Sequence, residues 1–191
     1  MTKEKRYKWR REDYKENTRG LLMVNTGDGK GKTTCALGLI LRAVGQGLRC
    51  CLIQFMKAKG DKYGEHISLE ELGVEVHTMG DGFTWDTEDR AQDIKTSEET
   101  WALCSEKLNG GEYDLLVFDE LVYVLDYKFL DETAVLNEIE QVRKAQPALH
   151  IVMTGRNASD KLIEAADLVT RMEEVKHPFN NGIFAQKGIE F

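Results

Sequence analysis

A glycine-rich segment with two lysines and three threonines, residues 26–34, carries the strongest chemical signal in the sequence. It reads Thr-Gly-Asp-Gly-Lys-Gly-Lys-Thr-Thr, follows the apolar run Leu21–Val24 and precedes a run typical of a helix. Small residues let successive backbone N–H groups point inward, and the positive end of the helix dipole that follows attracts anions. The segment therefore predicts a phosphate-binding loop between a strand and a helix.

The loop fits the pattern G-x-x-x-x-G-K-S/T except at its first position, where Thr26 replaces the glycine. In that pattern Lys32 neutralises phosphate oxygens, Thr33 ligates Mg²⁺ and Gly31 allows a phosphate to approach closely. A glycine-rich turn can also bind nothing, but the order of strand, loop and helix favours a nucleoside triphosphate, whose orientation the missing glycine leaves open. The predicted binding residues of the loop are Gly27, Asp28, Gly29, Lys30, Gly31, Lys32, Thr33 and Thr34.

Two adjacent carboxylates, Asp119 and Glu120, end an apolar run that begins at Tyr113. P-loop proteins place the acidic residue that completes their Mg²⁺ site at the end of such a buried strand. A strand end that faces solvent would carry two acids without a ligand, but the preceding apolar residues favour a metal-facing role. The pair predicts a metal site beside the phosphate loop.

Two further loops follow expected strands and carry candidate ligand contacts. Arg156 follows the apolar run Leu149–Thr154, where a guanidinium lies near bound phosphates if the sheet is parallel. Phe83 and Trp85 lie in a glycine-rich loop after another expected strand. These aromatics either face a ligand at the edge of the sheet or cover the end of the core, and the residues alone leave both open.

Apolar runs typical of buried strands alternate with runs typical of helices along the whole chain. This order predicts an α/β fold: a single P-loop (RecA-like) domain built on a doubly wound, mostly parallel sheet of about six strands. The strands are expected at residues 21–24, 49–55, 74–79, 113–120, 149–154 and 168–172. The helices are expected at residues 35–44, 66–72, 87–109, 122–127, 132–145 and 159–166.

Composition and charge limit the class of protein that the chain can belong to. A chain of 191 residues with 41% hydrophobic content can bury one substantial core. We expect a basic helical arm at residues 1–19 and a nucleotide-binding catalytic domain at residues 20–191. The arm holds eight basic and four acidic residues, so the net charge of −7 leaves the body at about −11. A basic arm is compatible with nucleic acid, and equally with lying on its own acidic surface or on that of a neighbouring subunit. The acidic body argues against a nucleic-acid channel.

Several sequence features favour a cytoplasmic protein without a bound zinc ion. The sequence shows neither a signal peptide nor an apolar run long enough for a membrane span. The four cysteines lack zinc-site spacing, which favours small buried side chains in a reducing compartment. The histidines, among them His66, His77 and His150, have no partner at ligand spacing, so we expect them to serve packing.

Seven motifs together resemble one family, the ATP:corrinoid adenosyltransferases of the P-loop type, over nearly the whole chain. No generic nucleoside triphosphatase shares that set. The motifs are the loop at residues 26–34, Gln54-Phe55, Gly82–Thr87, Asp119–Tyr123, Thr154–Arg156, Val175–His177 and the ending Gly188–Phe191.

The resemblance implies a reaction in which a Co(I) corrinoid attacks the 5′ carbon of ATP, accepts the adenosyl group and releases triphosphate. It implies that Lys32, Thr33 and Glu120 serve catalysis, with Thr33 and Glu120 holding Mg²⁺ or Mn²⁺. It also implies a triphosphate bound in the reverse of the ordinary direction, cradled by Gly27–Thr33. Asp28 departs from the family, in which many members carry Asn at this position.

The same resemblance implies the partners of the protein. Phe83 and Trp85 are expected to line the corrinoid side of the site. A homodimer is expected, with the amino-terminal arm folded over an active site. A flavoprotein reductase is expected as the electron donor, and neither nucleic acid nor a membrane is expected to bind.

Two other functions compete with adenosyl transfer. A P-loop kinase or hydrolase would cleave at the γ-phosphate and yield ADP, but offers no role for the aromatic loop. A RecA-like module would use ATP as a switch and bind nucleic acid through the basic arm, with strong salt dependence.

Overall fold

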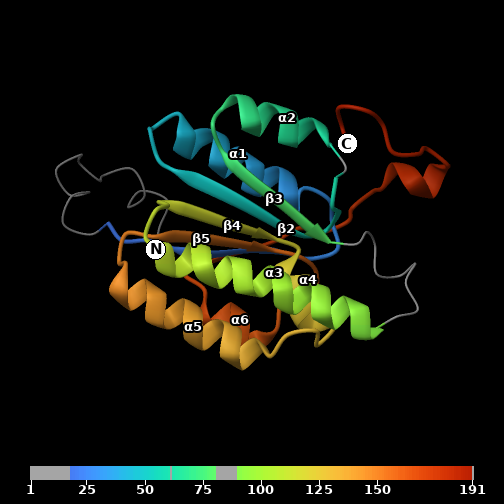
Figure 1. Ribbon diagram of the computed structural model, residues 1–191. Helices are drawn as coiled ribbons and strands as arrows, with labels where there is room; N and C mark the ends of the chain where they lie inside the picture. Colours follow the sequence, from blue (N-terminus) through green and yellow to red (C-terminus); the bar gives the residue numbers. More distant parts are fainter. Residues whose placement is uncertain (1–17, 61, 81–89, 191) are drawn as a thin grey trace, which may run out of the picture.

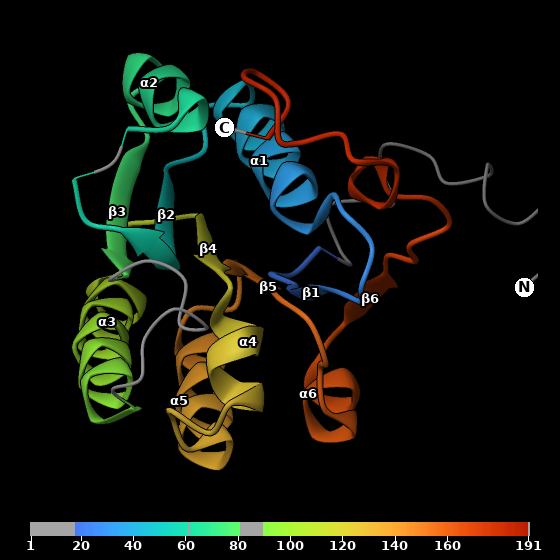
Figure 2. The same cartoon turned by 90° about the vertical axis from the view of Figure 1, so that its right-hand side faces the viewer.

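Six parallel strands form one sheet, in the order β3-β2-β4-β5-β1-β6 (Figures 1 and 2). The computed structural model describes residues 18–60, 62–80 and 90–190 of the chain. All neighbouring strands of this sheet pair in parallel, which confirms the predicted doubly wound α/β fold. The strands are β1 (Leu22–Thr26), β2 (Cys50–Ala58), β3 (Glu75–Gly80), β4 (Leu115–Asp119), β5 (His150–Thr154) and β6 (Leu168–Arg171).

Helices cover both faces of this sheet, as a parallel sheet requires. Figure 2 shows α1 and α2 on one face and α3, α4, α5 and α6 on the other. A 3₁₀ turn at Pro178–Asn181 follows in the tail. The helices are α1 (Lys32–Val44), α2 (Gly64–Glu71), α3 (Arg90–Gly110), α4 (Leu121–Asp126), α5 (Glu132–Ala145) and α6 (Asp160–Ala165).

The core is divided by the sheet into two layers, because neighbouring strand residues point to opposite faces. On β4, Phe118 belongs to the layer under α3, α4 and α5, while Val117 belongs to the layer under α1 and α2. All five residues of β1 and of β4 are buried. The nearly continuous apolar runs that predicted these strands therefore reflect burial on both faces.

The element boundaries differ from the prediction at the places that concern the site. Helix α1 begins at Lys32 instead of Cys35, so the lysine and threonine of the phosphate loop lie in its first turn. Strand β2 continues to Ala58, beyond the expected Phe55, which carries Lys57 to the edge of the sheet where the phosphate loop lies. Ser159 accepts a hydrogen bond from Leu162 N and so caps α6, as predicted.

The carboxyl ends of β1, β4 and β5 meet at one edge of the sheet, which is where ligands bind in open α/β sheets. The residues at these ends are Thr26, Asp119 and Thr154. Within the described ranges, no helix has the length and apolar character needed to cross a bilayer. Residues 1–17 of the predicted arm lie outside the described residues.

Candidate nucleotide and metal site

The glycines of the phosphate loop are needed for two reasons, backbone conformation and close packing. Gly31 directly precedes α1 with φ of 109°, a left-handed conformation that favours glycine. Gly27 and Gly29 pack against the chain that leaves β6: Gly29 N donates to Met172 O over 2.9 Å, and a Cβ on Gly27 would lie 2.3 Å from the same oxygen. The additional glycines therefore let the loop lie against residues 172–173.

Thr26, which stands at the first position of the phosphate-loop pattern, has a structural role of its own. It is buried, has no positive φ, and its hydroxyl accepts a hydrogen bond from Ala158 N at 3.1 Å. This contact ties the end of β1 to the segment after β5. Glycine is not required there, because the backbone of Thr26 is not left-handed.

Lys32 extends along the inside of the loop. Its Nζ donates to Gly27 O over 2.8 Å and to Gly29 O over 2.9 Å. Burial lowers the pKa of Lys32, and the negative charge of Glu120 opposes this shift. Among the described residues, the Lys32 ammonium is thus buried and held by carbonyl groups, and anionic phosphate oxygens are stronger partners for it.

Asp119 accepts hydrogen bonds from three side chains. Thr33 Oγ1 donates to Oδ1 over 2.9 Å, Thr154 Oγ1 donates to the same oxygen over 2.7 Å, and Gln54 Nε2 donates to Oδ2 over 2.9 Å. The side chain of Asp119 is almost completely buried. Its charge is therefore compensated within the protein, and its role is to orient these donors.

Glu120 contrasts with its neighbour. Its backbone is left-handed, with φ of 64°, and its N–H donates to Thr154 Oγ1 over 2.9 Å. No hydrogen bond or ion pair joins its carboxylate to another described residue. Burial, followed by the charge of Asp119, raises the pKa of Glu120 to about 7. A strained, poorly compensated carboxylate of this kind is typical of a functional site.

The donor set fits a hard divalent cation such as Mg²⁺. Asp119 accepts a hydrogen bond from the Thr33 hydroxyl, which leaves the oxygen lone pairs of Thr33 available to a metal. Glu120 supplies a carboxylate whose negative charge lacks a paired cation among the described residues. The structure thus brings Thr33 and Glu120 to one cavity, as the predicted metal pair requires.

That cavity has a volume of about 570 Å³, within the range of small-molecule sites. The predicted residues Lys30, Gly31, Lys32, Thr33, Thr34 and Glu120 line it. Gly27 and Asp28 line a second cavity of about 450 Å³, formed with residues 157–158 and 171–174. The structure therefore places the second half of the loop, but not Asp28, in the cavity of the candidate metal ligands.

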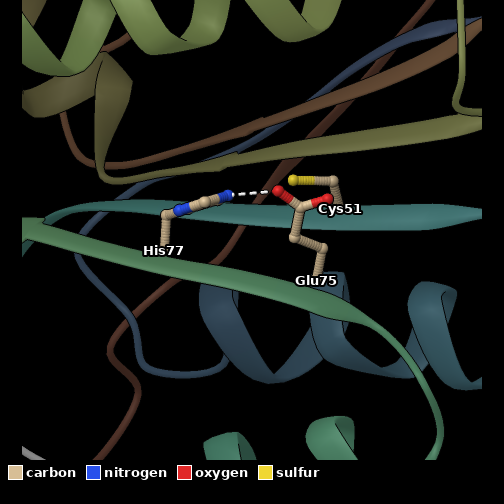
Figure 3. A group of neighbouring side chains, drawn as sticks. All are labelled: Cys51, Glu75 and His77. Atoms are coloured by element: carbon tan, nitrogen blue, oxygen red, sulfur yellow. Dashed lines mark hydrogen bonds and ion pairs between the residues drawn. The ribbon is translucent and has the colours of Figure 1, made fainter.

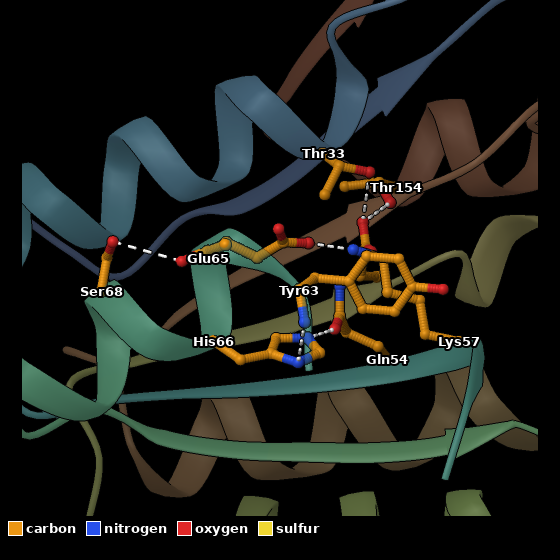
Figure 4. A network of polar contacts seen from close by, with 10 residues as sticks. Thr33, Gln54, Lys57, Tyr63, Glu65, His66, Ser68 and Thr154 are labelled. Carbon is orange, nitrogen blue, oxygen red and sulfur yellow. Dashed lines mark hydrogen bonds and ion pairs between the residues drawn. The ribbon is translucent and has the colours of Figure 1, made fainter. Parts of the chain in front are cut away.

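One wall of the 570 Å³ cavity, formed by the end of β2 and by α2, was not predicted from the sequence. Lys57, Glu65 and Ser68 line it, and Lys57 forms an ion pair with Glu65 while its Nζ lies 4.0 Å from the centre of the Tyr63 ring (Figure 4). The sequence held a weak signal, a lysine two residues beyond the apolar strand run. Nothing local indicated that this segment would face the phosphate loop.

The carboxy-terminal tail forms a further wall, and its chemistry was also missed. Gly188, Ile189 and Glu190 line the same cavity, and Glu190 forms an ion pair with Lys30 of the loop. In Figure 2 the tail returns from β6 and passes beside α1. The Glu190 carboxylate is thus paired with Lys30, a lysine that was predicted to bind phosphate.

Arg156, among the described residues, does not line this cavity. Arg156 is exposed after β5 and forms no hydrogen bond or ion pair with another described residue, although its charge opposes the raised pKa of Glu120. Phe83 and Trp85 lie outside the described residues, so their proposed contact with a corrinoid stays a prediction.

A second cluster with metal-ligand atoms lies between β2 and β3. Ligand atoms of Cys51, Glu75 and His77 lie within 4.8 Å of one another (Figure 3). However, Glu75 accepts hydrogen bonds from Tyr113 and Lys107, which lower its pKa to about 2, and burial raises the pKa of Cys51 to about 12. The Lys107 ammonium already compensates the carboxylate and the thiol keeps its proton, so this network serves to hold β3 against α3.

Comparison with known proteins agrees with this geometry. Residues 18–191 match the family model described as ATP:corrinoid adenosyltransferase BtuR/CobO/CobP. A corrinoid adenosyltransferase of Pseudomonas aeruginosa is 43% identical over 176 residues, covering 91% of this chain and 84% of that protein. One of Sinorhizobium is 40% identical over 180 residues, covering 93% and 83%. One of Escherichia coli is 38% identical over 177 residues, covering 92% and 88%.

A solved structure supports the fold in addition. The flagellar accessory protein FlaH from Methanocaldococcus jannaschii superimposes with a TM-score of 0.57 at 12% identity, over 80% of this chain and 71% of that one. At this identity the likeness concerns the fold alone, and it agrees with the expected RecA-like P-loop domain. From the family match and its relatives together, the chain belongs to the ATP:corrinoid adenosyltransferase family.

Proposed function

We propose that this protein transfers the 5′-deoxyadenosyl group of ATP to the Co(I) centre of a corrinoid and releases inorganic triphosphate. The corrinoid is cobyrinic acid a,c-diamide, cobinamide or cobalamin. The observation that carries the proposal is the cavity in which the phosphate loop faces the poorly compensated carboxylate of Glu120, in a chain of this family. Neither phosphoryl transfer nor an ATP-switched nucleic-acid module is favoured by a specific contact.

The reaction balances without a protein base. The electron pair of Co(I) forms the bond to C5′, the bond between C5′ and the triphosphate oxygen breaks, and the triphosphate leaves with that bonding pair. The cobalt becomes alkyl-Co(III), and no proton is transferred. The protein therefore has two tasks, to position the 5′ carbon and to stabilise the charge of the leaving group.

The residues of the loop suit the second task. Lys32 and Lys30 supply positive charge, and the backbone N–H groups at the start of α1 would face an anion held by the loop. Thr33 and Glu120 would hold Mg²⁺ or Mn²⁺, which supplies further positive charge to triphosphate when bound. Stabilising an anion that forms as the bond breaks is the largest contribution a site of this kind can make.

The corrinoid side of the site is proposed to come from the 80–87 loop and the amino-terminal arm, most of whose residues lie outside the described ranges. Phe83 and Trp85 would exclude an axial ligand from the cobalt, and the arm at residues 1–19 would cover an active site on the domain at residues 20–191. We further propose a cytoplasmic homodimer that receives electrons from a flavoprotein reductase.

One incubation tests the function. The protein is mixed with MgATP and chemically reduced cobalamin or cobinamide, and both products are measured. We expect light-sensitive adenosylated corrinoid and triphosphate in equal amounts. Formation of ADP instead would indicate phosphoryl transfer or hydrolysis, and salt-dependent DNA binding without either product would indicate the nucleic-acid module.

A further inference from the structure

A chain of hydrogen bonds connects the start of α2 with the candidate metal site (Figure 4). His66 Nε2 lies 2.6 Å from Gln54 Oε1, and Gln54 Nε2 donates to Asp119 Oδ2 over 2.9 Å. Asp119 in turn accepts from the hydroxyl of Thr33. Gln54, His66 and Asp119 are all buried, with exposed fractions of 0%, 4% and 2%. Buried polar groups of this kind are retained only with specific partners.

The hydrogen bond from Tyr63 N to His66 determines the direction of the other hydrogen bonds in this chain. Tyr63 N donates to His66 Nδ1 over 3.3 Å, so Nδ1 is an acceptor and the ring proton lies on Nε2. Nε2–H must then donate to the oxygen of the Gln54 amide. That contact turns the amide nitrogen toward Asp119, whereas a flipped amide would direct an oxygen at the carboxylate.

The last step of the chain concerns the metal. Asp119 Oδ2 is held by Gln54, so Oδ1 stays directed toward the hydroxyls of Thr33 and Thr154. A hydroxyl that donates its hydrogen to Asp119 presents its lone pairs elsewhere, and Thr33 lines the same cavity as Glu120. Partners of metal ligands commonly orient them in this way.

We propose that His66 and Gln54 are positioning residues that set the orientation of Asp119 and, through it, the metal-binding hydroxyl of Thr33. This inference rests on the metal site of the proposed function but not on the identity of the adenosyl acceptor. It gives His66 a role beyond packing. It also couples the cavity wall at Tyr63 and α2 to the metal site, because the His66 tautomer depends on the backbone N–H of Tyr63.

The test compares two substitutions of similar size. His66→Leu removes the donor to Gln54, while His66→Gln keeps a donor in its side-chain amide. Calorimetry measures the ATP dissociation constant of each folded variant with Mg²⁺ and with EDTA. His77→Ala is the control, because His77 also hydrogen-bonds a polar side chain, that of Glu75, which is not part of the chain of hydrogen bonds to Asp119.

We expect His66→Leu to weaken Mg²⁺-dependent ATP binding by roughly tenfold, the usual effect of losing such a partner. ATP binding in EDTA should change by less than about twofold, and His66→Gln should restore most of the loss. Equal losses with Mg²⁺ and with EDTA, or identical behaviour of the two variants, would overturn the proposal. An ATP affinity of the wild-type protein that does not depend on Mg²⁺ would also overturn the proposal.

A measurement on the wild-type protein covers the case in which His66→Leu does not fold. The ¹⁵N shifts of the His66 ring should show a proton on Nε2 and none on Nδ1. A proton on Nδ1 would contradict the chain of donors. If adenosyl transfer fails while the Mg²⁺ effect of His66→Leu is present, the proposed function is wrong and the positioning role stands. The opposite pattern overturns only the positioning role.

Discussion

The hydroxyl of Thr33 donates a hydrogen bond to Asp119 over 2.9 Å, which joins the first turn of α1 to the end of β4. The two neighbouring carboxylates, Asp119 and Glu120, therefore have different roles. Asp119 is compensated by three donors and organises the site. Glu120, whose charge is not paired among the described residues, is available to a cation.

The two carboxylates should therefore respond to amide substitution in opposite ways. At pH 8, Asp119→Asn should lower the stability of the free protein by about 1–3 kcal/mol, because an amide nitrogen would meet groups that are themselves donors. Glu120→Gln should raise the stability at this pH, because it removes a buried charge. Thermal unfolding of both variants without ligand measures this, and a loss of stability in both would contradict the assignment.

The pH dependence of stability provides a further check on Glu120. Its pKa is about 7 in the folded protein against an ordinary 4.5. A raised carboxyl pKa means that the folded state binds the proton more tightly, so the contribution of Glu120 to stability is lost as the pH rises from about 4.5 to 7. The gain from Glu120→Gln should be full above pH 7 and shrink toward pH 5. A gain that does not depend on pH would show that charge is not its cause.

Binding of the metal should have the opposite pH dependence. Mg²⁺ needs the charged form of Glu120, so the proton must leave below pH 7. We expect the apparent Mg²⁺ affinity in the presence of ATP to rise up to about tenfold per pH unit below pH 7 and to level off above it. Calorimetry on wild type and Glu120→Gln isolates the contribution of Glu120 to this pH dependence, because the titration of ATP itself is common to both proteins. Equal slopes in the two proteins would exclude Glu120 as the ligand.

The phosphate loop should be essential for turnover but not for folding. Lys32→Ala and Thr33→Ala should each reduce adenosyl transfer by roughly 100-fold or more, because charge stabilisation of the leaving triphosphate is lost. Thr33→Ser keeps the hydroxyl and should retain much more activity than Thr33→Ala. Lys144→Ala, on the exposed surface of α5, serves as a control. Initial rates and melting curves measure the effects, and near-normal rates in both alanine variants would refute the site.

The ion pair between Glu190 and Lys30 should oppose ATP binding. Glu190→Gln removes a carboxylate from the wall of the cavity and frees Lys30 for phosphate. We expect the ATP dissociation constant to fall by about two- to fivefold at low salt, the range of a solvent-exposed ion pair. Glu140→Gln, which breaks the exposed pair with Lys144, is the matched control. Weaker binding in Glu190→Gln would show that the tail assists the nucleotide instead.

The aromatic residues of the 80–87 loop should act on the corrinoid and not on ATP. An axial ligand makes reduction of Co(II) harder, and bulky side chains beneath the ring would exclude it. Phe83→Ala and Trp85→Ala should lose the four-coordinate Co(II) signal in electron paramagnetic resonance and keep MgATP binding. Phe179→Ala, on the exposed tail, is the control. A full signal in both variants, or an equal loss of ATP binding, would remove this role.

The sequence by itself determined the fold class, the phosphate loop and the family, because each depends on a local pattern. Apolar runs buried on both faces predicted the parallel sheet, and the structure confirms six parallel strands. Residues 26–34 formed a recognisable motif, since a loop that binds phosphate needs small residues and a cation within a few positions of one another. Asp119 and Glu120 were found for the same reason.

Only the tertiary structure decided which of these residues meet. Thr33 and Asp119 are 86 residues apart, Gln54 and Asp119 are 65 apart, and Lys30 and Glu190 are 160 apart. Parallel strands bring their carboxyl ends to one edge through long crossovers, and no local pattern encodes which side chains then come within hydrogen-bond distance. His66 was therefore expected to serve packing, and its place in the chain of hydrogen bonds emerged only when α2 was positioned beside β2.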